Sequence, residues 1–593
     1  MSLFGDLYVG TSGLKTSQEA INVVAHNVTN TDTEGYVRQQ VSQKTREYNR
    51  IDMSFQGVAM KQSGLGVYIG EVRQVRDRFL DLSYREEIGR QGFYDASFGA
   101  IEEIEEIFGE MDGATFYEAM NDFWTSIEEL VKDPGSEVCQ SMFVQYAQSF
   151  AEAAGNVYSD LANYQNKLNN KVDDYVDRIN EIGHEIYKLN NSVRGIEAGG
   201  VENANDLKDQ RNKLLDELSE IVNISYSDDT FGNVLVKIEG HDFVRMDKVN
   251  EIGCDLDDKS GFYKVYWPDL AKSYLDSDGN KIYDPDSAPI FDFTVEISSA
   301  TDTDIGALKG TVLARGDHKG NWTDLFNEES YNEVKDSVMM NVMAEFDGLV
   351  RNVVTAVNKV LKDSAIDATN SINPSSTYLR DSDGNPIQLF TRKAVTDTTI
   401  PETISVEDLS NGTYSLGPYD FDSKAYIMKD AYGNELEGRY TKMPDGSYIG
   451  DSSLWFSVEN ISVNQELLQY PTNLGFVKPD GSMDYEVAKK LEASFLDKDY
   501  ILNPNLTNPI AITDYYSNLV AQISNSGNVY KSLKENQELT VNSVEGTRQG
   551  TMGVASDEEL SNMIKFQNAY NASSRFINVI DECLEHLITT LGS

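Results

Sequence analysis

The stretch AHNVTNTDTEGYVRQ, residues 25–39, ends one sequence pattern and begins another. Before it, eight apolar or small residues follow one another at steps of four and three: Leu3, Leu7, Gly10, Leu14, Ser17, Ile21, Val24 and Val28. That spacing places all eight on one face of a helix and predicts a heptad stripe. Gly10 and Ser17 are small, so a partner helix can approach closely at these two positions.

The helix ends inside the quoted stretch, because residues 30–35, Asn-Thr-Asp-Thr-Glu-Gly, are turn formers. Gly35 can adopt a positive φ angle. Residues 36–41 then have the pattern of extended chain. We therefore expect the helix to stop, the chain to reverse, and a strand to lead away from the terminal helix.

The C-terminal end carries a matching stripe with steps of three and four: Met563, Phe566, Tyr570, Ser573, Ile577, Ile580, Leu584, Leu587 and Leu591. Ser556 and Glu559 have the spacing of a capping box, and acidic residues there favour a helix N-terminus. The predicted helix has ~35 residues and a length of ~50 Å. Two arrangements fit these stripes: a hairpin of the two ends within one chain, or paired ends that dock onto neighbouring copies.

The 593 residues exceed what one core can organise, so three or four domains are expected. The chain has 50 Lys and Arg against 97 Asp and Glu, a formal charge of −47. This balance lacks the basic surface that nucleic-acid binding or a polybasic membrane contact requires. Cys139, Cys254 and Cys583 lie far apart, which argues against a disulfide framework or a zinc site.

No apolar run reaches the ~18 residues that a membrane span needs. The first residues, MSLFGDLYVGTSGL, lack the basic and apolar regions of a cleaved signal peptide. The expectation is a chain without membrane insertion that is cytoplasmic or exported by a route that leaves its N-terminus uncut.

The interior alternates between helical and strand patterns. Helices are expected at 95–131, 137–193, 204–222, 330–363 and 511–540. Strands are expected near 232–240, 262–267, 291–297, 412–428 and 438–458, with Asp445-Gly446 as a hairpin turn. The predicted fold is a multidomain α+β chain with paired coiled-coil terminal helices, a long helical bundle and inserted β-rich outer domains.

Four units follow from these patterns. Terminal axial helices comprise 1–40 with 555–593, and a helical bundle domain comprises 41–225 with 306–365 and 505–554. A small β-rich insertion occupies 226–305, and an outer β-rich domain occupies 366–504.

Several short motifs suggest chemistry but fit simpler structures. The two Asp-Ser-Asp-Gly-Asn runs, at 276–280 and 381–385, place Gly at position four rather than the sixth position of a calcium loop. We interpret them as tight turns, with a weak calcium site as the alternative. The sequence contains no phosphate-binding loop, no G-x-S-x-G motif and only five His residues. We therefore predict no catalytic, metal or cofactor site.

Both ends resemble the flagellar axial proteins, the rod, hook and hook-associated family. The resemblance rests on Ser12-Gly13-Leu14, Gln18, Ala20, Asn27, Asn30, Thr33, Gly35 and Tyr36, and on Gln567, Ala569-Tyr570 and Ala572-Ser573. The chain departs from the family pattern at Glu34, where a proline is common. Tyr36-Val37-Arg38-Gln39 and residues 203–226, with Asp209-Gln210-Arg211 and Leu214-Leu215, resemble the hook-associated member that lies directly on the hook.

The resemblance implies a structural subunit, not an enzyme, at the junction between hook and filament. Members of this family are exported unfolded through the flagellar secretion channel and polymerise outside the cell, where their terminal helices form the inner tube. The implied partners are further copies in a ring or tube, the hook protein below, a second hook-associated junction protein above, and an export chaperone. Two alternatives stay open: another axial protein, such as hook protein or flagellin, and a secreted adhesin with coiled-coil ends.

Two residue sets carry these expectations. The predicted assembly interface is the terminal stripe, namely Leu3, Leu7, Leu14, Ile21, Val24, Val28, Met563, Phe566, Tyr570, Ile577, Ile580, Leu584, Leu587 and Leu591. The predicted turn motif is Asn27, Asn30, Thr33, Gly35, Tyr36, Arg38 and Gln39.

Overall fold

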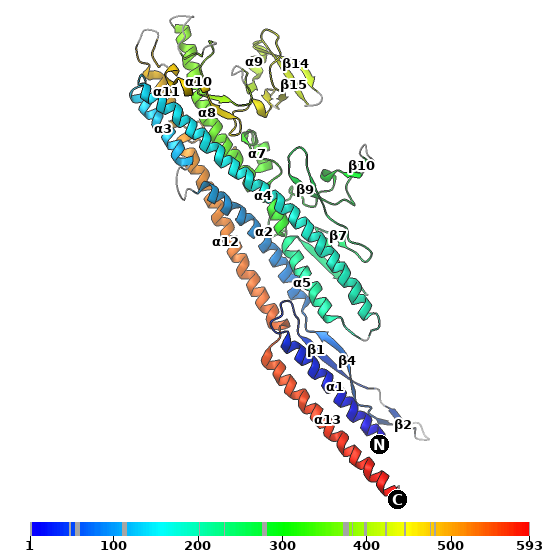
Figure 1. Cartoon of the computed structure of the whole chain (residues 1–593). Coiled ribbons are helices and arrows are strands. Elements are labelled where there is room, and N and C mark those ends of the chain that lie inside the picture. Colours follow the sequence, from blue (N-terminus) through cyan, green and yellow to red (C-terminus); the bar gives the residue numbers. More distant parts are fainter. Residues whose placement is uncertain are drawn as a thin grey trace.

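The computed structural model shows an elongated molecule with both termini at one end (Figure 1). It describes residues 3–46, 49–53, 60–109, 116–200, 202–230, 232–275, 281–371, 379–381, 384–395, 400–420, 424–443, 446–474, 476–478 and 482–591. Helices α1 (Leu3–Thr29) and α13 (Ser556–Leu591) lie side by side at the terminal end. Both predicted terminal helices are therefore present, and they pair within one chain.

The strands that follow α1 turn back along it. Strand β1 (Gln39–Thr45) pairs antiparallel with β4 (Val67–Gln74), and both contact α1. Between them, β2 (Asn49–Met53) pairs with β3 (Met60–Ser63). The expectation that the strand leads away from the terminal helix was wrong. One cause is Ser12, whose Oγ accepts a hydrogen bond from the backbone N–H of Val67 at 3.2 Å.

Long helices fill the middle of the molecule (Figure 1). They are α2 (Arg78–Phe108), α3 (Phe116–Lys132), α4 (Glu137–Glu197), α5 (Asn205–Ile221), α6 (Ala307–Arg315), α7 (Glu328–Val334), α8 (Val338–Ser371) and α12 (Ile512–Met552). The five predicted helical regions are confirmed. The region predicted at 330–363 is divided between α7 and α8, and α12 runs twelve residues beyond its predicted end at 540.

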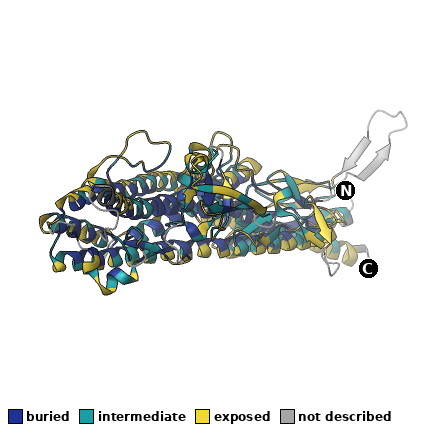
Figure 2. Cartoon of the chain, turned by 90° about the horizontal axis from the view of Figure 1, so that it is seen from above, coloured by how far each residue is buried: buried dark blue, intermediate teal, exposed yellow. Residues whose placement is uncertain are grey.

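Two large apolar cores stabilise these helices, and α4 connects them. Its residues up to Leu168 pack in the first core with α3, α8 and the start of α12. From Val172 onward it packs in the second core with α5, β6 and β7. A helix of 61 residues is ~90 Å long, so α4 is a continuous strut through both cores. Buried residues run through this helical part, away from the end that carries the termini (Figure 2).

Short sheets cover the second core. Strands β5 (Ile224–Asp228), β6 (Val234–Ile238) and β7 (His241–Val244) form one sheet. Two hairpins follow, β8 (Gly253–Leu256) with β9 (Tyr263–Tyr266), and β10 (Ser273–Leu275) with β11 (Lys281–Tyr283). A short 3-10 helix, η1 (Pro285–Ser287), comes next.

The strand expected at 291–297 is absent, and its polar residues explain why. The Asp292 carboxylate accepts hydrogen bonds from the backbone N–H of Thr294 at 2.9 Å and from its hydroxyl at 2.6 Å. This local side-chain bonding replaces the ladder that a strand needs. Alternation alone therefore gave the wrong prediction for this segment.

The region 366–504 contributes to two different cores. Its outer part is a five-stranded sheet in the order β13-β17-β16-β15-β14, built from Thr403–Ile404, Tyr448–Gly450, Tyr440–Lys442, Ala425–Asp430 and Tyr414–Asp420. A small core of its own holds this sheet. The predicted turn at 445–446 joins β16 to β17. Asp445 lies outside the described residues, and Gly446 has a φ of +88°.

The rest of that region packs on the first helical core. It comprises β12 (Phe390–Arg392), β18 (Ile461–Val463), α10 (Gln465–Gln469) and α11 (Tyr485–Leu496). Shorter elements are α9 (Val406–Ser410), η2 (Trp322–Leu325), η3 (Ser452–Leu454) and η4 (Pro471–Leu474). The fold class is confirmed as multidomain α+β. The four domain boundaries stay a prediction.

Candidate assembly site

Two glycines of α1 allow α13 to approach closely. A Cβ atom built on Gly10 would lie 2.8 Å from Cγ1 of Ile577, and one on Gly13 would lie 2.8 Å from Oγ of Ser573. Such distances are too short for real carbon contacts, so a larger residue at either position would require the α13 side chain, or α13 itself, to shift. The small residue at position 10, singled out from sequence, therefore marks a helix contact, while Ser17 is itself buried.

Ile577 and Ser573 of the predicted stripe lie against Gly10 and Gly13 of α1, but the stripe is only partly covered. Val24 and Ile580 are buried, and Leu587 is exposed. Partly exposed positions are Leu7, Leu14, Ile21, Val28, Met563, Phe566, Tyr570, Ile577 and Leu584. The side chains of Leu3 and Leu591 lie outside the described residues. One helix thus covers one side of the stripe and leaves its edges accessible.

Outside the predicted stripe, α13 carries exposed apolar side chains that sequence reasoning missed. We call Leu560, Ile564, Phe576 and Val579 the outer apolar residues; their exposed fractions are 49, 60, 44 and 56 %. A heptad reading assigns the apolar residues to one stripe and ignores those outside it. The available signal was the excess of large apolar residues over what a single stripe requires.

The predicted turn motif closes the end of α1 around the side chain of Asn27, which is completely buried. Asn27 Oδ1 accepts hydrogen bonds from the Tyr36 hydroxyl at 2.8 Å and from the Gln39 backbone N–H at 3.0 Å. Its Nδ2 donates to the Gln39 carbonyl and to Glu559, each at 2.9 Å. Gly35 has a φ of +79°, which confirms the expected tight reversal. One amide therefore links the end of α1, the start of β1 and the start of α13.

Other members of the motif hold the turn locally. The Asn30 side-chain amide donates to the His26 carbonyl at 2.9 Å, and the Thr33 hydroxyl donates to Asn30 Oδ1 at 3.2 Å. Glu34, where the family pattern has proline, forms an ion pair with Lys213 of α5 at 2.7 Å. The departure from the pattern thus adds a contact to the central helices.

Arg38 joins the turn to α13. Its Nε forms an ion pair with the buried Glu559 at 2.8 Å, and its Nη1 with Glu558 at 2.9 Å. The backbone N–H of Arg38 donates to the Met552 carbonyl at the end of α12, at 2.9 Å. The sequence predicted that Glu559 forms a capping box with Ser556. Its carboxylate instead accepts hydrogen bonds from Asn27 and Arg38.

The same turn contacts the start of α5. The backbone N–H of Val37 donates to Asp209 at 3.3 Å, and Gln39 Nε2 donates to Asp206 at 3.0 Å. Gln74, at the end of β4, donates to Asp209 at 2.6 Å. Burial raises the pKa of Asp209 to about 7, although these hydrogen bonds act in the opposite direction. Together, residues 27–39, the start of α5 and Glu559 form what we call the terminal joint.

A charge network stabilises the central helices next to the terminal joint. Arg548 of α12 pairs with Asp81 of α2 at 3.1 Å and with Asp216 of α5 at 2.6 Å. Arg76 binds Asp81 at 2.5 Å, and Arg85 binds Asp216 at 2.7 Å. Sequence reasoning found neither this network nor the role of Glu559, because Arg548 and Glu559 lie more than 300 residues from the partners named here.

Other candidate sites receive little support. The described residues contain no group of three or more His, Cys, Asp or Glu side chains arranged to hold a metal. The run at 276–280 lies outside the described residues, as do residues 382 and 383 of the second run. In that run, Asp381 Oδ1 accepts the Asn385 backbone N–H at 2.8 Å, as expected for a tight turn. Among the described helices, none is apolar over enough residues to cross a membrane.

Comparison with known proteins gives three family matches in chain order. Residues 7–36 match the flagella basal body rod protein family. Residues 101–372 match the helical domain of flagellar hook-associated protein FlgK. Residues 549–590 match the C-terminal family of the flagellar basal body rod FlgEFG proteins. The first and third matches cover the terminal helices, and the second covers most of the central helices.

Whole-chain relatives agree with these matches. Flagellar hook-associated protein 1 of Bacillus subtilis (strain 168) is 26% identical, and the alignment covers 100% of this chain and 99% of that protein. The same-named protein of Escherichia coli (strain K12) is 21% identical over 97% of this chain and 98% of its own length. The structure of the flagellar hook junction protein FlgK from Burkholderia pseudomallei has a similar fold, with a TM-score of 0.51 and 13% identity, over 79% of this chain and 99% of that one.

Proposed function

Because this chain belongs to the flagellar hook-associated protein family, we propose that it is a structural subunit of the bacterial flagellum that forms the junction between hook and filament. The role is one of binding between subunits and not of catalysis. The observation that carries its mechanism is the pair of terminal helices, which stands apart from both large cores and bears the outer apolar residues.

The proposed mechanism is docking of preformed helix pairs. Within one chain, α1 covers one side of α13 and leaves Leu560, Ile564, Phe576 and Val579 accessible. Contact with helices of neighbouring copies would remove these side chains from water, which is favourable by ~25 cal/mol per Å². The assembly interface then includes the outer apolar residues as well as the accessible edges of the predicted stripe.

The terminal joint would orient each docked helix pair relative to its own central helices. Asn27, Arg38 and Glu559 are linked by hydrogen bonds and an ion pair at the base of both terminal helices. Residues 37 and 38 and the end of β4 are held there by hydrogen bonds to Asp209 of α5 and to the Met552 carbonyl of α12. A subunit that joins two unlike assemblies needs such a fixed geometry, because its two ends contact different neighbours.

The proposed partners follow from the position in the flagellum. They are further copies of this chain in a ring or tube, the hook protein on one side, and a second hook-associated protein on the other. An export chaperone would hold the chain before assembly. The proposed location is extracellular, after passage through the flagellar secretion channel without cleavage of a signal peptide.

Another axial role, as hook protein or flagellin, remains the alternative. The match of residues 101–372 to a hook-associated helical domain favours the junction role. Electron microscopy separates the two. Cells that lack a junction subunit carry hooks without filaments and release filament protein into the medium, whereas cells that lack hook protein carry no hooks.

The test of the mechanism compares two exposed apolar residues. Val579→Asp places a charge among the outer apolar residues, and Leu539→Asp places one on α12, where Leu539 is 69 % exposed. In a strain that lacks this protein, we expect the Leu539→Asp variant to restore filaments and the Val579→Asp variant to leave bare hooks. Circular dichroism of both purified variants should match that of the native protein. Normal filaments with Val579→Asp would contradict the mechanism.

A further inference from the structure

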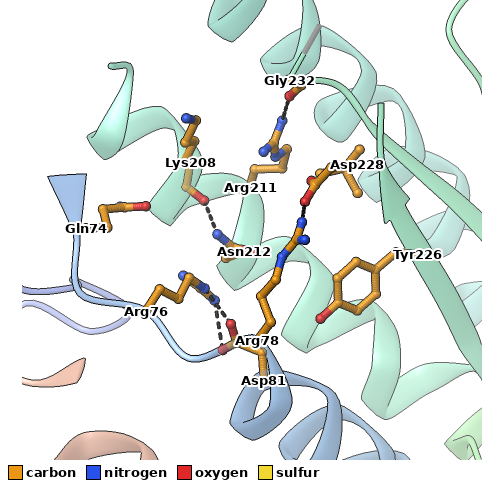
Figure 3. Close-up of a pocket in the computed structure, with 11 residues that line it drawn as sticks. Gln74, Arg76, Arg78, Asp81, Lys208, Arg211, Asn212, Tyr226, Asp228 and Gly232 are labelled. Carbon is orange, nitrogen blue, oxygen red and sulfur yellow. Dashed lines mark hydrogen bonds and ion pairs between the residues drawn. The ribbon is translucent and has the colours of Figure 1, made fainter. Parts of the chain in front are cut away.

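A cavity of about 290 Å³ lies behind the terminal joint, between the β4–α2 connection, α5 and the β5–β6 hairpin (Figure 3). Its lining includes four cationic side chains: Arg76, Arg78, Lys208 and Arg211. Asn212 and Tyr226 add hydrogen-bonding groups, and two carboxylates, Asp81 and Asp228, also line it. The space far exceeds the ~30 Å³ that one water molecule occupies in the liquid. This concentration of cations is unusual in a chain with a formal charge of −47.

Three of the four cations have carboxylate partners. Arg76 binds Asp81, Arg78 binds Asp228, and Lys208 binds Glu197. These ion pairs leave donors unused. Nη1 of Arg76 is buried, and no acceptor among the described residues lies within hydrogen-bond distance of it. The nearest carboxylate oxygen, of Asp209, is 3.8 Å away.

Arg211 differs from the other three because its partners are neutral. It is 4 % exposed, and its Nη1 donates to Asn190 Oδ1 and to the Gly232 carbonyl, each at 2.9 Å. Its Nε is buried and lacks an acceptor among the residues that the structure describes. Burial, together with the nearby cations Arg76 and Arg85, lowers the pKa of Arg211 to about 10, while Glu197 and Asp229 act in the opposite direction. A buried guanidinium whose hydrogen-bond partners are neutral is costly, so a compensating anion would bind favourably.

We propose that this cavity binds a small tetrahedral oxyanion, phosphate or sulfate, with Arg211 as its principal counter-charge. Several oxygens with lone pairs in different directions match donors that converge from three chain segments. In Figure 3, the side chains of Arg76, Arg78 and Arg211 lie around the same space as Asn212. A single carboxylate has two oxygens in one plane and would satisfy fewer of these donors.

The bound anion would connect the terminal joint to the second core. Arg76 lies between β4 and α2, Arg78 is the first residue of α2, Arg211 belongs to α5, and Gly232 precedes β6. An ion held between these segments stabilises the folded protein by mass action, because the unfolded chain does not present the site. The inference does not depend on the flagellar role.

The experiment uses the purified full-length chain with inorganic phosphate as the probe. Isothermal titration calorimetry is expected to give saturable binding with a Kd of about 1 mM or lower. The midpoint of thermal unfolding should rise with phosphate concentration when chloride is adjusted to hold the ionic strength constant. Acetate at the same ionic strength should bind at least tenfold more weakly.

The double variant Arg78→Gln/Lys208→Gln tests the location of the site. Both side chains reach solvent, with exposed fractions of 73 and 25 %, so the variant should fold, whereas a change of the buried Arg211 risks unfolding. The Kd for phosphate is expected to rise at least tenfold. The control Arg178→Gln removes an equally paired cation from α4, outside the cavity, and should leave the Kd within twofold.

Three results would overturn the proposal. One is an equal unfolding midpoint in phosphate and chloride, and another is acetate binding as tight as phosphate binding. The third is a double variant that binds phosphate within twofold of the native chain.

Discussion

The central helices and the terminal helix pair have similar spacings of apolar residues but bury those residues to different extents. In the centre, residues such as Phe346 and Val353 are completely buried between several elements. In the terminal pair, three described apolar side chains are buried: Ala20, Val24 and Ile580. The same heptad-like spacing therefore produces a closed core in one region and a half-covered contact in the other.

The difference lies in the number of neighbours. Most apolar residues of the central helices are covered by other helices or by short sheets of the same chain, although Leu539 of α12 is exposed. The helix α13 packs against α1 and keeps the outer apolar residues exposed. The centre is thus stabilised by contacts within one chain. The terminal pair would gain further stability if neighbouring copies covered its exposed apolar side chains. Hydrogen exchange should be slower in the centre than in the terminal pair of the monomer, and this gap should narrow on assembly.

The largest expected effect is in the centre. Phe346 contacts the rings of Phe108 and Phe116, with centroids 5.6 and 4.9 Å apart. Phe346→Ala should lower the free energy of unfolding by about 3–5 kcal/mol, through lost burial and the cavity left behind. Urea unfolding followed by circular dichroism measures it, with Val579→Ala as the exposed control. A loss below about 1 kcal/mol would mean that the core is less tightly packed than the structure indicates.

The next effect concerns the contact inside the terminal pair. Ile577 lies against Gly10, so Ile577→Asp puts a carboxylate into the α1–α13 contact. We expect a loss of about 2–3 kcal/mol from the pairing of these helices, with unfolding of the centre unchanged. Hydrogen exchange locates the loss, and a motility assay should show that cells no longer swim. Normal swimming with this variant would contradict the assembly role of the stripe.

Removal of the ion pair at the terminal joint ranks third. Arg38→Met leaves the buried carboxylate of Glu559 with Asn27 as its remaining recorded partner. The expected cost is about 2 kcal/mol, visible as faster hydrogen exchange at residues 27–39 and 553–563. The matched control is Lys213→Met, whose exposed partner Glu34 loses little when it is unpaired. Equal effects of both variants would show that the joint is not held by this pair.

A comparison of two glycines gives a smaller effect. A Cβ on Gly10 would meet Ile577 at 2.8 Å, whereas one on Gly5 has no atom within 4 Å. Gly10→Ala should therefore weaken the pairing by about 1 kcal/mol, and Gly5→Ala should strengthen the helix slightly. Circular dichroism of the two monomers, as a function of temperature, distinguishes them. If Gly10→Ala and Gly5→Ala both raise the unfolding temperature, α13 can shift to accept the added methyl group and its contact with α1 is loose.

Sequence reasoning predicted local features well and distant pairings poorly. The positive φ at Gly35 and the extent of the C-terminal helix depend on neighbouring residues, and both were predicted correctly. Glu559 was assigned to a capping box because its spacing from Ser556 allows one. Its actual partner, Arg38, is 521 residues away and could not be inferred from spacing.

The failed predictions have two different physical causes. The segment 291–297 alternates like a strand, but the Asp292 carboxylate takes up the backbone N–H of Thr294 locally. The outer apolar residues were missed because one stripe already explained why α13 is a helix. The spacing of apolar residues shows which face of a helix can be buried. The number of elements that pack against the helix decides whether that face is buried.

The last comparison, a dependence on pH, again separates the two regions. Burial raises the pKa of Asp209, at the terminal joint, and of Glu345, in the centre, to about 7 each. The unfolded chain releases these protons near pH 4. The folded state therefore holds more protons between about pH 4 and 7, so its stability falls as pH rises through that window, by at most about 1.4 kcal/mol per pH unit for each group.

Two isosteric variants assign these contributions. Glu345→Gln should reduce the pH dependence of global unfolding, because Glu345 bonds Asn503 and Gln522 inside the first core. Burial also raises the pKa of Asp347, on the same helix, to about 7, so part of this dependence should remain. Asp209→Asn should leave that profile nearly unchanged and should flatten only the pH dependence of hydrogen exchange at residues 27–39. Such a result would mean that the terminal joint unfolds locally while the central helices stay folded. If Asp209→Asn instead flattens the global profile as much as Glu345→Gln, the terminal joint and the centre unfold as one unit, and the distinction between the two regions fails.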